Sequence, residues 1–266
     1  MINELKESLL AAYLQCYNHL DKYRDVEIYC ISEMKKDNRE GAPRYTADRD
    51  QVPGNLATCV IINGSTLEVI SNTLISPSFA IGAEVRGYQR EQCSQGAPLD
   101  CRIATKVHGG GWSDEDDIFD TGKIYVSLGE NLNECNVITE TIACERLNRS
   151  SDSEHILINL VDAMLEANFL PQDLMVVIAT ERIPCESCTR TMLKFLERNA
   201  AAKLYVGYTY DTNPSKGCLA RSDKEFIKQV GESNSSDRIQ LDRVLVENKS
   251  LQCFSTRLQI KHGPRA

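Results

Sequence analysis

The chain has 266 residues, of which 42% are hydrophobic and 26% are charged, as in ordinary soluble globular proteins of one large domain or two small ones. Its net charge of −8 disfavours binding along extended nucleic acid, because phosphate contacts need clustered Lys and Arg. No apolar run approaches the ~20 residues that a membrane-spanning helix needs, so we expect no membrane partner.

The cysteines and the N-terminal residues indicate the cellular compartment of the protein. There are 11 cysteines, an odd number, and they are scattered along the chain. Charged side chains at Glu4, Lys6 and Glu7 interrupt any apolar core of a signal peptide. We therefore expect a cytoplasmic protein with mostly reduced thiols.

The first 75 residues predict a helix, a strand and a hairpin. Leucines and tyrosines recur at helical spacing over 2–23, which predicts an amphipathic helix. Residues 25–32 alternate between apolar and polar, which is typical of a strand. The β-rich segments 57–62 and 65–70 flank an Asn-Gly pair, which favours a type I′ turn and a β-hairpin.

The second half of the chain has a clearer pattern than the middle. Residues 76–150 are expected to form an insertion or lid between the hairpin and the next helix. Six further elements are expected: helices over 152–168, 185–199 and 222–230, and strands over 173–179, 203–208 and 243–247. Strand–helix–strand units imply parallel pairing with helices on both faces. We therefore predict a single α/β domain over 1–266, a three-layer α-β-α sandwich around a mixed five-stranded sheet.

Two short motifs carry the chemistry. They are Asp152-Ser153-Glu154 and Pro184-Cys185-Glu186-Ser187-Cys188. A Cys-x-x-Cys that opens a helix puts two thiolates on one side of a metal, and Pro suits a helix start. A third ligand must then come from elsewhere in the chain, and a fourth position stays open for water, as in catalytic zinc sites.

These motifs resemble the signature of the zinc-dependent nucleobase deaminases, the cytidine deaminase-like superfamily. That signature is His-x-Glu followed by Pro-Cys-x-x-Cys, and its Glu carries protons without binding the metal. Here Pro184, Cys185 and Cys188 match the second half, and Glu154 matches the Glu of the first. Asp152 stands where the family usually has His or Cys, and a carboxylate oxygen is an acceptable zinc ligand.

The resemblance implies a hydrolase that uses Zn2+ to deaminate cytosine or adenine. The base would belong to a nucleoside, a nucleotide or single-stranded nucleic acid, and the protein would form homo-oligomers. The similarity is to the branch with AID/APOBEC-like, tRNA adenosine and bacterial toxin deaminases. By analogy, that branch suggests a role in bacterial conflict or phage defence.

Four further positions are assigned only through the resemblance. Asn72 stands where the family often has an Asn that holds the base or ribose. Tyr208, Tyr210 and Asp211 lie in a segment similar to the Tyr-Asp-x-x-Pro-type loop near the target base. Packing in the core explains the two tyrosines as well as base stacking does.

Alternatives remain open at this point. Asp152 could cap a helix, which Asp favours, and His155 could replace it as a ligand. The chain could also be a catalytically inactive deaminase fold that serves as a zinc-binding interaction module. A thiol redox protein would use Cys185 and Cys188 alone, and it would leave Glu154 unexplained.

Overall fold

The computed structural model describes residues 2–40, 42–43, 55–71, 73–77, 88, 107–108, 125–127, 152–210, 223–247 and 250–255. The helices are α1 (Ile2–Lys36), α4 (Ser153–Glu166), α5 (Glu186–Arg198) and α6 (Asp223–Gly231). The strands are β1 (Leu56–Asn63), β2 (Leu74–Pro77), β3 (Val107–His108), β4 (Tyr125–Ser127), β5 (Leu174–Arg182), β6 (Lys203–Tyr210), β7 (Ile239–Glu247) and β8 (Ser250–Ser255).

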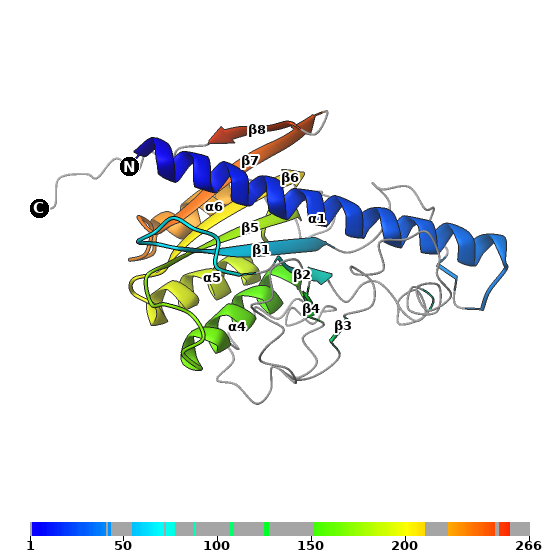
Figure 1. Ribbon diagram of the computed structural model, residues 1–266, viewed down its shortest axis with the longest axis horizontal. Helices are drawn as coiled ribbons and strands as arrows, with labels where there is room; N and C mark the ends of the chain where they lie inside the picture. The colour runs from blue at the N-terminus through cyan, green and yellow to red at the C-terminus, as the bar shows by residue number, and fades with distance from the viewer. Residues whose placement is uncertain are drawn as a thin grey trace, which may run out of the picture.

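The strands form a mixed sheet in the order β3-β4-β2-β1-β5-β6-β7-β8 (Figure 1). β5, β6 and β7 run parallel to one another, whereas β1 is antiparallel to both β2 and β5. The prediction of an α/β fold with a mixed sheet is thus confirmed. Within the described residues the sheet has eight strands in place of five, because β3 and β4 extend one edge and β8 extends the other.

Helices cover both faces of this sheet (Figure 1). Alternate residues of β5 point to opposite faces, so Val177 belongs to the core under α1 while Val176 belongs to the core under the other helices. On that second face, α4, α5 and α6 contribute buried residues such as Leu157, Phe195 and Phe226. The result is a three-layer arrangement, with the sheet in the middle.

The predicted strand over 25–32 is wrong, because α1 continues without a break to Lys36. The buried positions of this stretch include Arg24, Glu27, Ile31 and Met34, which follow helical spacing. Two of these positions are charged, so the hydrophobic pattern alone does not reveal that they form the buried face of a helix. The buried charges are stabilised by ion pairs described below.

The hairpin prediction is right about β1 and wrong about its partner. The segment 65–70 makes only an isolated bridge to β1, between Ile62 and Val69, and β1 pairs instead with β2. Asn63 does not have the positive φ that a type I′ turn requires; its side chain accepts hydrogen bonds from the backbone N–H groups of Ser65 and Thr66. These bonds hold a wider turn.

The remaining expectations for the second half are met to within a few residues, and β7 begins four residues earlier than predicted. Most of the proposed insertion over 76–150 lies outside the described residues. Within the described ranges, no helix combines the length and apolar character needed to cross a membrane.

Candidate metal centre

The candidate site forms where two helices begin. α4 starts after Asp152, and α5 starts after Cys185, three residues beyond the carboxyl end of β5. Ligands often bind at the carboxyl ends of strands in sheets of this kind. Both helix N-termini also bring partial positive charge to the site, which favours carboxylate and thiolate groups.

Three potential metal ligands converge there. Asp152, Cys185 and Cys188 each offer one ligand atom, and these atoms lie within 4.8 Å of one another. Asp152 Oδ2 is 3.3 Å from Cys185 Sγ and 3.5 Å from Cys188 Sγ, and the two sulfur atoms are 3.5 Å apart. Both cysteines are free thiols. The three residues predicted as ligands are therefore brought together.

These spacings fit a small tetrahedral ion. With Zn–S bonds of about 2.3 Å and Zn–O bonds of about 2.1 Å, tetrahedral angles place two sulfurs ~3.8 Å apart and a sulfur and an oxygen ~3.6 Å apart. The observed distances of 3.3 to 3.5 Å are slightly shorter, so an ion would fit after a small outward movement of the donors. Two thiolates and one carboxylate leave one position of a tetrahedron open.

Asp152 occupies the N-cap position of α4, yet its side chain makes no capping hydrogen bond. Its backbone is extended, with φ −71° and ψ 139°, and its Oδ2 faces the two sulfur atoms. The sequence alone left capping and ligation open, and this geometry favours ligation.

Cys188 is buried, whereas Cys185 is partly exposed. The hydrogen bond with Cys185, followed by burial and by the nearby acidic groups, raises the pKa of the Cys188 thiol well above its usual range. A cation would reverse this effect, because metal binding deprotonates a coordinating thiol. A metal ion bound by this donor set would therefore supply positive charge that favours the thiolate form.

Glu154 lies next to the three ligands and is only 3% exposed. Its Oε2 is 3.7 Å from Cys188 Sγ and accepts a hydrogen bond of 3.0 Å from Ser153 Oγ. Burial, and then the Asp152 carboxylate, raises the pKa of Glu154 above its usual range. A carboxyl group with a raised pKa suits proton transfer near neutral pH.

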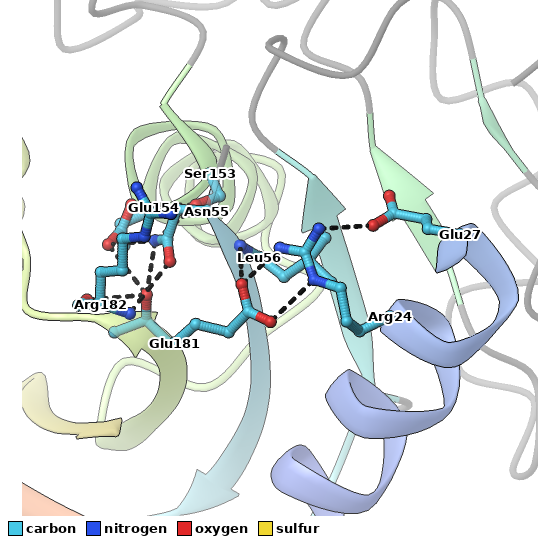
Figure 2. Close-up of polar contacts among 9 residues, drawn as sticks. Arg24, Glu27, Asn55, Leu56, Ser153, Glu154, Glu181 and Arg182 are labelled. Atoms are coloured by element: carbon cyan, nitrogen blue, oxygen red, sulfur yellow. Dashed lines mark hydrogen bonds and ion pairs between the residues drawn. The ribbon is translucent and has the colours of Figure 1, made fainter. Parts of the chain in front are cut away.

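Asn55, which precedes β1 and contacts Glu154, was not predicted from the sequence. Its Nδ2 lies 2.8 Å from Glu154 Oε1, 2.6 Å from Thr180 Oγ1 and 3.1 Å from Ser153 Oγ (Figure 2). Its Oδ1 accepts a hydrogen bond of 3.1 Å from the backbone N–H of Arg182. Asn55 belongs to no motif, so only the pairing of β1 with β5 could reveal this role.

His155 does not face the cluster of potential metal ligands. Its buried ring has Nδ1 at 2.9 Å from Thr191 Oγ1 and Nε2 at 3.2 Å from Asn159 Nδ2. Burial lowers the pKa of His155 to about 4, although Asp152 acts in the opposite direction. A neutral ring held between α4 and α5 is part of the helix packing, which removes it as the alternative ligand.

The structure describes only part of the predicted substrate contacts. Tyr208 is fully buried in the core beneath α4 and α5, so packing accounts for its position. The backbone of Tyr210 ends β6, and its side chain lies outside the described residues. Asn72 and Asp211 also lie outside them, and their assignments stay predictions.

Comparison with known proteins adds no assignment. No protein-family model matches the chain, and no curated protein sequence matches it significantly.

Proposed function

We propose that this protein is a zinc-dependent hydrolase that deaminates a nucleobase, cytosine or adenine. The observation that carries the proposal is the position of Glu154: a buried carboxyl group beside an Asp-Cys-Cys cluster, yet outside the set of ligands. A purely structural zinc site has no use for such a group, and it normally has four protein ligands.

The proposed chemistry divides between the metal and Glu154. Asp152, Cys185 and Cys188 would hold a zinc ion, which would supply the positive charge that makes water a nucleophile near neutral pH. Glu154 would take a first proton from that water at Oε2, the oxygen nearer to Cys188, and pass it to the ring nitrogen. It would then carry the second proton, from the added hydroxyl group, to the leaving amine. Oxygen replaces the exocyclic amine, and ammonia is released.

The test compares the parent protein with Glu154→Gln. The assay is ammonia release from cytosine- and adenine-containing nucleosides, nucleotides and single-stranded oligonucleotides, together with zinc per chain. We expect the variant to keep its zinc and to lose at least ~10²-fold in kcat, as expected when a general acid–base group is removed. Equal turnover in parent and variant would refute the mechanism.

A catalytically inactive zinc-binding module is the second candidate. One observation favours it: a carboxylate, Asp152, stands where deaminases usually have His or Cys. This candidate predicts bound zinc and no ammonia release with any substrate of the panel, and it gives Glu154 no role. The partners, the oligomeric state and the kind of substrate also stay proposals, and they depend on which of these two functions the assay supports.

A further inference from the structure

We propose that Asn55 is a positioning residue that holds Glu154 at one carboxylate oxygen and so directs the other oxygen, which would carry protons, toward the cluster of potential metal ligands. This inference rests on the proposed function for its catalytic meaning. The geometry on which it stands is independent of that function.

The two oxygens of Glu154 have different surroundings. Oε1 lies within hydrogen-bond distance of two donors, Asn55 Nδ2 at 2.8 Å and Thr180 Oγ1 at 3.0 Å. Oε2 lies near Ser153 Oγ and Cys188 Sγ, on the side of the metal ligands. A carboxylate held this way at Oε1 cannot rotate without losing both donors, so Oε2 stays directed at the ligand cluster.

Asn55 offers more hydrogen-bond donors than Thr180, which makes it the centre of the hydrogen-bond network around Glu154. Thr180 has one hydroxyl hydrogen, which Glu154 and the Arg182 carbonyl, 3.1 Å away, can each accept. Asn55 has two amide hydrogens and lies close to Ser153, Glu154 and Thr180 at once. A neutral amide can supply these bonds where a carboxylate could not, because a carboxylate offers no N–H.

A second set of contacts fixes the backbone beside Asn55. The next residue, Leu56, donates its backbone N–H to Glu181 Oε2 at 3.3 Å. Glu181 is in turn paired with the buried Arg24 of α1, which also pairs with Glu27 at 2.8 Å (Figure 2). Neighbouring residues of β5 point to opposite faces, so Thr180 holds Glu154 while Glu181 ties Leu56 to α1. Asn55 is thus held at its side chain and at the following peptide.

The test compares three variants with the parent, and a fourth, Glu154→Gln, serves only to assign the NMR signal of Glu154. Asn55→Ala removes the amide, and Asn55→Asp keeps its shape but removes both donors. Gln15→Ala is the matched control, because Gln15 is a half-buried amide that donates to Thr73 Oγ1 at 2.9 Å, away from Glu154. Zinc per chain, kcat and KM for ammonia release are measured for each. A carboxyl NMR spectrum of protein labelled with 13C at the glutamate side-chain carboxyl supplies a readout that needs no activity.

The signal of Glu154 is identified by its absence from the Glu154→Gln spectrum. We expect both Asn55 variants to shift this signal, to keep zinc, and to lose about 10- to 100-fold in kcat with KM changed less than ~2-fold. Gln15→Ala should match the parent in all four measurements.

Separate results would refute the inference and the proposed function. An unshifted Glu154 signal in Asn55→Ala, or parent-like kcat in Asn55→Asp, would overturn the role of Asn55. Loss of zinc in Asn55→Ala would also overturn it, because the residue would then act on the ligands. A parent that releases no ammonia would refute the proposed function. The carboxyl NMR signal would still show whether Asn55 positions the Glu154 carboxyl group.

Discussion

The close packing of α1 on β6 depends on Gly207, and replacing this glycine should destabilise the protein. A Cβ atom at position 207 would lie 2.7 Å from Tyr13 Cε1, 3.1 Å from Tyr13 Cδ1 and 3.0 Å from Val244 Cγ2. Carbon atoms normally pack about 3.5–4.0 Å apart, so the ring of Tyr13 would have to move by several tenths of an ångström.

The Tyr13 ring has little freedom to make that movement. Its hydroxyl donates a buried hydrogen bond of 3.0 Å to Asp242 Oδ2, and Gln240 Nε2 donates to both oxygens of the same carboxylate. Displacing the ring therefore strains or breaks a buried polar contact as well as the packing. Overpacking of this kind costs about 1–3 kcal/mol, and we expect Gly207→Ala to fall in the upper half of that range.

Urea unfolding of Gly207→Ala measures this cost, with Gly231→Ala as the matched control. Gly231 ends α6, and a Cβ there would meet no atom within 4 Å, so we expect its free energy of unfolding to stay within ~1 kcal/mol of the parent. A free energy of unfolding for Gly207→Ala that equals the parent's would refute the packing of α1 on this face of the sheet.

Two further predictions concern buried ionisable groups. Arg24→Met should lower the free energy of unfolding by about 3–5 kcal/mol, because it removes the cation that pairs with the buried Glu27 and Glu181 carboxylates. Arg190→Ala, which breaks an exposed pair with Glu186, should cost less than ~1 kcal/mol. Equal costs in urea unfolding would contradict this reasoning. Burial raises the pKa of Cys16 to about 12 from its usual 9.0, so its contribution to stability is complete below pH 9 and is lost as the pH rises toward 12. The difference in unfolding free energy between the parent and Cys16→Ala should shrink by ~1.4 kcal/mol per pH unit above pH 9, and a difference that does not change with pH would count against it.

The sequence predicted the elements whose hydrophobic pattern is local and regular. β5 is apolar on both faces and is buried along almost its whole length, and α4 and α5 begin within one residue of their predicted starts. The cluster of potential metal ligands was predictable for the same reason, since Asp152, Cys185 and Cys188 all lie at helix starts that flank β5. When two halves of a motif are separated only by short, regular helices and strands, the sequence predicts that they lie close together in the folded protein.

Structural features that depend on buried charges or on contacts between residues distant in the sequence were not predictable. The second half of α1 buries Arg24 and Glu27, and the charge of these residues conceals a helical stripe. Asn55 lies 99 positions from Glu154 in the sequence, and the register of β1 on β5, with Ala57 opposite Thr180, brings them together. The Asn-Gly pair at 63–64 predicted a tight turn, whereas the Asn63 side chain stabilises a wider one.

Zinc content is the most direct test of the site. Metal analysis would be performed on the freshly purified parent, on Asp152→Ala, and on Asp173→Ala, which removes a carboxylate just before the opposite end of β5. We predict one zinc per chain in the parent and in Asp173→Ala, and loss of zinc in Asp152→Ala. Zinc retained by Asp152→Ala would show that the third ligand lies elsewhere, and a parent without zinc would contradict the metal centre itself.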